Sequence, residues 1–236
     1  MKVFVLEGHN DIIFMETILR EYFSLEEFPK THDREFQRSI NILRRRLLNQ
    51  KEYHWIKTNF GFMVYGDNGR RTIINKVLPR LVSDIIGKIA DPVELFVVLD
   101  EDEKPLQKTI KVIYQKLQEK QIPYTDVSLL PEDKIVVKSS IDSRYQMVIK
   151  IYLIPESLEK QLVKCALSEI KLPSRKKTDL LSMDPHDALR EIADILDMPR
   201  DDIIRDIVVR HGFCEYEWFL EFITEINQFL DFNESM

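Results

Sequence analysis

Acidic side chains end two of the most apolar stretches of the chain. Residues 96–103, FVVLDEDE, are an apolar run followed by four acids, which places Asp100 and Asp102 one residue apart. Glu7 follows another apolar run, and Asp11 comes four residues after it. Carboxylate oxygens are the ligands that hard cations such as Mg²⁺ and Mn²⁺ prefer. Carboxylates that converge on one site repel each other, so such a cluster calls for a counter-charge.

Alternating elements of secondary structure are expected to position these acids. Apolar runs at residues 2–8, 60–69 and 93–102 are typical of buried strands, and a helical pattern follows each. This alternation predicts an α/β, Rossmann-like fold with a mainly parallel sheet flanked by helices. Ligands of such sheets bind at the carboxyl ends of the strands. If the first and third of these strands are neighbours, Glu7 and Asp100 lie at one edge of the sheet.

The second half of the chain changes character. Two further strands are expected at residues 133–140 and 146–155, as candidate partners around the turn at residues 139–144. Beyond Pro155 the patterns are almost all helical, and an aromatic stripe in the last helix is typical of core packing. We therefore expect an α/β domain over residues 1–160 and a helical C-terminal extension over residues 161–236.

A basic segment interrupts the alternation. Residues 24–58 have an amphipathic helical pattern, with seven Lys or Arg against two acids between Arg34 and Lys57. We interpret this segment as a basic helical insertion. Its cations either face solvent or bind phosphate with release of counterions. The candidates for nucleic-acid binding, together with a lysine near the acidic run, are Arg44, Arg45, Arg46 and Lys104.

The overall composition limits the classes of partner. The net charge of −6 and pI of about 5.5 argue against indiscriminate nucleic-acid binding, but not against a local basic groove or binding through a divalent cation. We expect no membrane partner and a cytoplasmic location, because no apolar run approaches ~20 residues and no signal-peptide pattern is present. Cys165 and Cys214 lack the spacing of a disulfide framework or zinc site. Few glycines and many charges favour a heat-adapted source.

The order of these motifs resembles that of the Toprim domain, and is closest to the OLD-nuclease branch and small uncharacterised archaeal relatives. FVLEGHND (4–11) resembles the motif that carries a glutamate after the first strand. VVLDEDE (97–103) resembles the aspartate-x-aspartate motif after the third. LIPESLEKQL (153–162) is similar to a later motif, in which a leucine–glutamate pair opens a helix. Gly66 and Gly69 look like the small turn after the second strand.

The resemblance covers about residues 1–165 and implies a function. Toprim domains bind Mg²⁺ and cut, join or polymerise nucleic-acid backbones, so the resemblance implies a Mg²⁺- or Mn²⁺-dependent nuclease acting on DNA or RNA. The residues that it assigns to metal ions are Glu7, Asp11, Asp100, Asp102 and Glu159, with Glu7, Asp100 and Asp102 as the catalytic members and Asp11 and Glu159 supporting a second ion.

Departures from the family keep two other functions open. The chain has no GxxxxGK[ST] motif, no zinc-binding module and no tyrosine in a recognisable topoisomerase motif. The first alternative is therefore a metal-binding Toprim module that binds nucleic acid or a nucleotide for a partner protein without cutting by itself. The second is an α/β domain whose acids are surface loops, which predicts that removal of Asp100 is harmless or stabilising. His186 shows no partner pattern.

Overall fold

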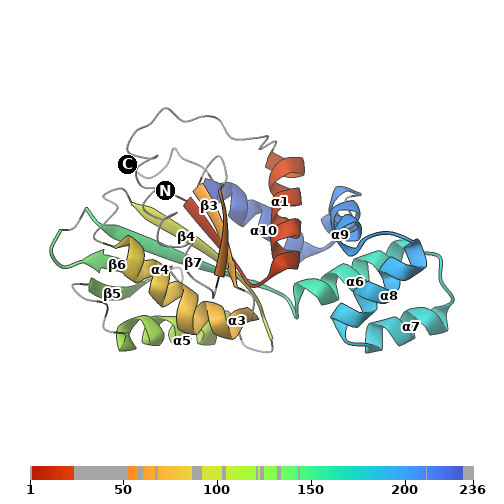
Figure 1. Ribbon diagram of the computed structural model, residues 1–236, viewed down its shortest axis with the longest axis horizontal. Helices are drawn as coiled ribbons and strands as arrows, with labels where there is room; N and C mark the ends of the chain where they lie inside the picture. The colour runs from red at the N-terminus through yellow and green to blue at the C-terminus, as the bar shows by residue number, and fades with distance from the viewer. Residues whose placement is uncertain are drawn as a thin grey trace. The chain divides into compact units, whose positions relative to one another are not determined.

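The computed structural model divides by internal contacts into two compact units, which are described separately below (Figure 1). It describes residues 2–23, 53–57, 61–66, 69–86, 92–102, 105–120, 122, 125–131, 134–142, 144–210 and 212–230. We call the described residues within 1–8, 27–99 and 103–153 the sheet unit, and those within 9–26, 100–102 and 154–236 the helical unit. The domain boundary that we expected after residue 160 marks the end of the Toprim-like domain. It is not the same as the division by contacts, and it stays a prediction.

The strands of the described residues form one seven-stranded sheet in the order β2-β3-β1-β4-β7-β6-β5. β1 is parallel to both β3 and β4, while β2 pairs antiparallel with β3, and β5, β6 and β7 pair antiparallel in turn. The strands are β1 (Lys2–Leu6), β2 (Tyr53–Lys57), β3 (Gly61–Gly66), β4 (Val93–Asp100), β5 (Thr125–Leu130), β6 (Lys134–Ser139) and β7 (Gln146–Ile154).

The centre of the sheet is parallel, and this confirms the α/β class expected from the sequence. The register aligns Val3 with Leu95 and Val5 with Val97, so the first and third predicted strands are neighbours. The amide of Glu101, just after β4, donates to the carbonyl of Ile154, the last residue of β7, at 2.9 Å. These two strands therefore also end at the same edge of the sheet.

Two strands differ from the sequence-based expectation. Residues 53–57 form β2, although we expected the end of a helical insertion there. Tyr53, Trp55 and Ile56 are residue types that are enriched in strands, and pairing with β3 decides the conformation. β5 (125–130) was missed because its side chains are mostly exposed, so its apolar pattern is weak. The rest of the expected insertion, 24–52 and 58, lies outside the described residues.

One face of the sheet packs on the helices of its own unit. Val3 and Val5 of β1 and Val97 and Leu99 of β4 are almost fully buried in a core with these helices. A π-helical turn lies just before Pro79, as suits a proline that cannot donate to the preceding turn. The helices are α3 (Gly69–Thr72), the π-helix η1 (Ile73–Val77), α4 (Leu78–Ile85) and α5 (Leu106–Glu119).

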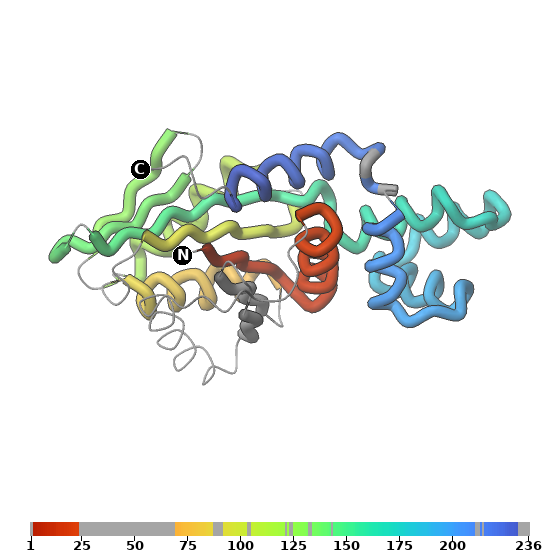
Figure 2. Tube along the Cα trace, turned by 90° about the horizontal axis from the view of Figure 1, so that it is seen from above, coloured from red at the N-terminus to blue at the C-terminus, as the bar shows by residue number. Residues whose placement is uncertain are grey.

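The helical unit joins the first helix of the chain to the C-terminal helices. α6 packs on α8 and α7, and α9 packs on α1 and α8, as the bundle in Figure 2 shows. Beyond Pro155, every regular element of the described residues is helical, as expected. The elements are α1 (His9–Phe23), α6 (Leu158–Glu169), α7 (Ser174–Ser182), α8 (Pro185–Leu196), α9 (Arg200–Val209), the 3₁₀-helix η3 (Gly212–Glu215) and α10 (Glu217–Leu230).

The aromatic stripe of the last helix is core, as predicted. Phe14 of α1 stacks on Phe222 of α10 with ring centroids 6.0 Å apart and contacts Phe213 edge-on at 5.7 Å. Phe219 and Phe222 are fully buried. Loss of such a phenylalanine costs about 3–5 kcal/mol, so this cluster is a main support of the helical unit. Among the described residues, no helix is long and apolar enough to cross a membrane.

Candidate functional site

Glu7 directly follows β1 and is held by the start of a helix within the sheet unit. Its Oε2 accepts a hydrogen bond from the backbone N–H of Arg70 at 2.7 Å. Gly69 precedes this amide with a φ of 64°, and a Cβ there would lie 3.5 Å from the same oxygen. The glycine therefore provides the left-handed turn that aims the amide at the carboxylate. The Arg70 guanidinium is buried and donates to Thr109 of α5.

Asp100 ends β4 and binds the start of α6. Its Oδ1 accepts from the backbone N–H of Leu158, the first residue of α6, at 2.9 Å. Ser157 caps the same helix conventionally by accepting from the Lys160 amide at 3.2 Å. Helix N-termini carry unsatisfied N–H groups and a partial positive charge, so they stabilise a carboxylate. Asp100 is thus oriented by the α6 N-terminus.

Asp102 lies in a turn with a left-handed backbone. Its φ is 44°, and its amide donates to the carbonyl of Glu156 at 3.3 Å. Glu156, in the turn after β7, is also left-handed, with a φ of 61°. A non-glycine residue in this conformation costs free energy, and such residues concentrate at functional sites. The two turns that follow β4 and β7 are therefore locally strained and hydrogen-bonded to each other.

The charge of Glu156 is already balanced. Lys160 and Lys164, one and two turns along α6, both form ion pairs with its carboxylate. Burial acts to raise the pKa of Glu156, but the hydrogen bonds from Lys160 and Lys164 outweigh it, so the pKa lies below its ordinary value. Glu156 is therefore a structural ion-pair partner of α6, and we do not count it among the candidate metal ligands.

Glu159 is buried in the first turn of α6 and held by α1. Its Oε1 accepts from the side-chain amide of Asn10 at 2.6 Å. Both side chains are about 8% exposed, and Asp11, next to Asn10, is 7% exposed. Asp11 lies in the first turn of α1, where an acid also interacts favourably with the helix dipole. His186 of α8 approaches the same Glu159 oxygen, with its Nδ1 3.7 Å away.

The sequence-based set thus falls into two groups of carboxylates. Glu7 belongs to the sheet unit, while Asp11, Asp100, Asp102 and Glu159 belong to the helical unit. The strands that carry Glu7 and Asp100 are neighbours and parallel. The four basic candidates for nucleic-acid binding, Arg44, Arg45, Arg46 and Lys104, lie outside the described residues.

The donor chemistry of the set fits Mg²⁺ or Mn²⁺, because every member offers carboxylate oxygens. Within the described ranges, however, no three His, Cys, Asp or Glu side chains converge as a ready-made metal cluster. Glu7, Asp100 and Glu159 each direct an oxygen to an N–H donor instead. A cation bound by these carboxylates would therefore compete with, or add to, the N–H donors that orient their oxygens.

Two partners of the carboxylates were missed at the sequence level. Asn10 was not among the candidate residues, yet its side chain donates to Glu159, 149 residues away. His186 was given no partner, yet it lies beside Glu159. A polar residue adjacent to a candidate acid, as Asn10 is to Asp11, is the one local signal that points to such a role. The other contact depends on the packing of α8 on α6.

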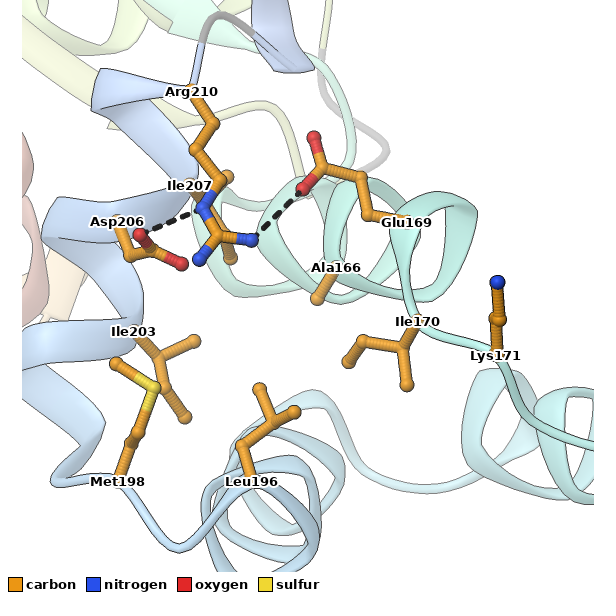
Figure 3. A pocket seen from close by; sticks show the side chains of 10 residues that line it. All are labelled: Ala166, Glu169, Ile170, Lys171, Leu196, Met198, Ile203, Asp206, Ile207 and Arg210. Atoms are coloured by element: carbon orange, nitrogen blue, oxygen red, sulfur yellow. Dashed lines mark hydrogen bonds and ion pairs between the residues drawn. The ribbon is translucent and has the colours of Figure 1, made fainter.

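A pocket in the helical unit lies at the opposite end of α6. It has a volume of about 260 Å³, with apolar walls that include Ile170, Leu196 and Ile203. Arg210 lies at its edge, donating to Asp206 at 2.8 Å and approaching Glu169 at 4.0 Å (Figure 3). Because α6 begins at Leu158 and the pocket lies around residues 166–170, the cavity is separate from the carboxylates.

Comparison with known proteins supports the fold alone. No family model and no curated protein matches the chain. The crystal structure of hypothetical protein PH0156 from Pyrococcus horikoshii OT3 matches with a TM-score of 0.54 and 16% sequence identity, over 96% of this chain and 95% of that one. At this identity the likeness concerns the arrangement of helices and strands, and it extends along nearly the whole of both chains.

Proposed function

We propose that the protein is a Mg²⁺- or Mn²⁺-dependent phosphodiesterase of Toprim type that hydrolyses the backbone of a nucleic acid. One observation carries the proposal. β1 and β4 are parallel neighbours, Glu7 directly follows the first, and Asp100 is the last residue of the second. Ligands of parallel sheets bind at the edge where strands end, and the order of these acids along the chain resembles that of the Toprim motifs.

The residues have distinct roles in this proposal. Glu7, Asp100 and Asp102 would hold the metal ion, and Glu7 is also the candidate general base. Asp11 and Glu159 would support a second ion. A divalent ion at such a site neutralises phosphate charge and lowers the pKa of bound water. The chain itself orients the acids, since the Arg70 amide holds Glu7, the Leu158 amide holds Asp100 and the Asn10 side chain holds Glu159.

The basic residues complete the proposal on the side of the substrate. Arg44, Arg45, Arg46 and Lys104 would bind backbone phosphates, which are the sequence-independent part of a nucleic-acid interface. Because the net charge of the chain is −6, this binding would be local and would depend on a divalent ion at the carboxylates.

A second candidate function is a metal-binding module that holds nucleic acid for a partner protein. The observations in its favour are the net charge of −6 and the absence of a GxxxxGK[ST] motif and of a zinc-binding module from the sequence. A module of this kind would bind a divalent ion and nucleic acid but leave the strand intact.

The test is cleavage of end-labelled single- and double-stranded DNA and RNA with Mg²⁺, Mn²⁺ or EDTA. Asp100→Asn is the variant, because asparagine can still accept the bond from the Leu158 amide and keep α6 capped. Asp126→Asn, an exposed acid on the edge strand β5, is the matched control. We expect metal-dependent cleavage that Asp100→Asn lowers by at least about 100-fold and the control leaves unchanged. Metal-dependent binding without cleavage would favour the module instead.

Asp102→Gly separates a functional aspartate from a surface loop. Glycine adopts a φ of 44° without strain, so the substitution is expected to change stability by less than about 1 kcal/mol, in the stabilising direction. If Asp102 holds metal, the same variant loses most cleavage and binds Mn²⁺ more weakly. Thermal unfolding and Mn²⁺ titration measure the two effects. Full cleavage by Asp102→Gly would remove this residue from the site.

A further inference from the structure

Arg200 has an unusual environment for a surface arginine. It is the first residue of α9, and its Nη2 donates to Nδ1 of His186 at 3.0 Å. Its Nε is buried and, within the described part of the chain, has no hydrogen-bond partner. Buried donors of a charged group are rarely left unsatisfied in folded proteins. Within the described residues, the Arg200 guanidinium is therefore not fully paired.

Other arginines of the same helices show the usual arrangement. Arg190 donates to Asp187 at 3.0 Å, Arg205 to Asp202 at 2.8 Å and Arg210 to Asp206 at 2.8 Å. Each pairs with an acid three or four residues before it, as is common on helix surfaces. Arg200 instead meets a histidine from another helix, fourteen residues away in sequence. Its positive charge has no such carboxylate among the contacts of the described residues.

The position in the helix adds to this uncompensated charge. A cation is disfavoured at a helix N-terminus, because the backbone N–H groups there already carry partial positive charge. Pro199 occupies the N-cap, and among the described residues no side chain caps α9. The two acids of the first turn face other groups, Asp201 towards His9 at 3.5 Å and Asp202 towards Arg205. Neither acid of the first turn therefore forms an ion pair with Arg200 among the described residues.

His186 contributes a second donor. Arginine can only donate, so Nδ1 of His186 must accept, which assigns the ring proton to Nε2. With Nδ1 as an acceptor, its 3.7 Å approach to Glu159 is not a hydrogen bond. The imidazole is more than half exposed, so its Nε2–H is accessible to a ligand. Arg200 and His186 thus present N–H donors next to each other and beside Glu159.

We infer that Arg200 and His186 form an anion site for a phosphate group, which on the proposed function belongs to the nucleic-acid strand held beside Glu159. The terminal Nη groups of an arginine without a carboxylate partner favour phosphate, since two of their N–H donors match two phosphate oxygens. The negative charge of Glu159, whose Oε1 lies 3.7 Å from Nδ1 of His186, opposes an anion there. A divalent cation at the carboxylates therefore strengthens phosphate binding. The inference rests on the proposed function for the nature of the strand, but not for the anion site itself.

The experiment measures binding of a fluorescein-labelled oligothymidylate by fluorescence anisotropy, in Ca²⁺ and in EDTA. We compare the wild type with Arg200→Gln, Arg200→Lys and the matched control Arg190→Gln, an arginine of α8 that pairs with an acid. Arg200→Gln is expected to weaken binding about tenfold and to reduce the slope of log K against log salt by about 1. Arg190→Gln should match the wild type. Arg200→Lys keeps the charge but loses the fork, so its affinity falls between.

Each outcome decides the inference. If Arg200→Gln and Arg190→Gln bind alike, or if the wild type binds neither oligothymidylate nor inorganic phosphate, the anion site is wrong. Thermal unfolding with inorganic phosphate distinguishes a site for free phosphate from a site for a nucleic-acid strand. If the site takes free phosphate, phosphate stabilises the wild type but not Arg200→Gln, and oligothymidylate does not bind. If oligothymidylate binds in an Arg200-dependent way but is not cut, the anion site is supported and the proposed function is wrong. If the protein cleaves the strand and Arg200→Gln binds it as well as the wild type, the proposed function is supported and the anion site is wrong.

Discussion

The two ends of α6 use the same types of residue in opposite ways. At the C-terminal end, Arg210 lies between Asp206 and Glu169, so opposite charges neutralise each other at the edge of an apolar pocket. At the N-terminal end, Glu159 is held by a neutral amide and Arg200 by a neutral imidazole. The first arrangement neutralises its charges internally, whereas the second leaves Glu159 and Arg200 with uncharged partners, as the proposed metal and phosphate sites require. A charged side chain that binds neutral partners is thus the better functional candidate.

The largest effect expected from this contrast is on cleavage. Glu159→Gln should reduce Mn²⁺-dependent cleavage by at least about tenfold, whereas Glu169→Gln should leave it unchanged. Stability should respond less at either end. Glu169 forms a long, exposed pair, so its loss costs at most about 1 kcal/mol. End-labelled substrate assays and urea unfolding of both variants measure these effects. Equal cleavage by Glu159→Gln and Glu169→Gln would contradict the functional difference between the two ends of α6.

A smaller effect is expected from the amide that holds Glu159. Asn10→Ala removes a buried donor at 2.6 Å, which should destabilise the fold by about 1–3 kcal/mol. The freed carboxylate also loses its orientation, so Mn²⁺ affinity should fall about tenfold. Isothermal titration with Mn²⁺ and thermal unfolding separate the two results. Thr17→Ala, which removes a buried hydroxyl of the same helix from the Ile13 carbonyl, is the control and should affect stability alone.

The smallest effect concerns the middle of α6. Burial raises the pKa of the Cys165 thiol to about 12, with smaller contributions in the same direction from Glu169 and Glu215. Because the folded-state pKa exceeds the ordinary value of 9.0, the unfolded chain loses this proton first, so stability falls as pH rises above 9. In a Cys214→Ser background, urea unfolding at pH 8 and pH 10 should show this loss, and Cys165→Ala should reduce it.

The same cysteine should be chemically inert in the folded protein. Cys165 is fully buried, and its thiolate is scarce at neutral pH. In the Cys214→Ser background, a thiol reagent at pH 8 should react only after urea is added. Rapid reaction of the native protein would contradict the packing of α6.

The class of fold could be predicted from local patterns. Residues 3–6 and 95–99 are continuous apolar runs, which are typical of a parallel strand buried on both faces. The helical character beyond Pro155 also followed from periodicity. β2 and β5 could not be predicted in this way, because both are outer strands whose pairing depends on a neighbour already in place.

The sequence by itself determined which acids follow strands, because the end of an apolar run is a local property. It therefore identified Glu7, Asp100 and Asp102 as candidates. Only the tertiary structure decided what holds and surrounds them. The contacts of Glu159 with Asn10 and of Arg200 with His186 join residues from different helices. Such contacts depend on how helices pack, a long-range property that no spacing along the chain encodes.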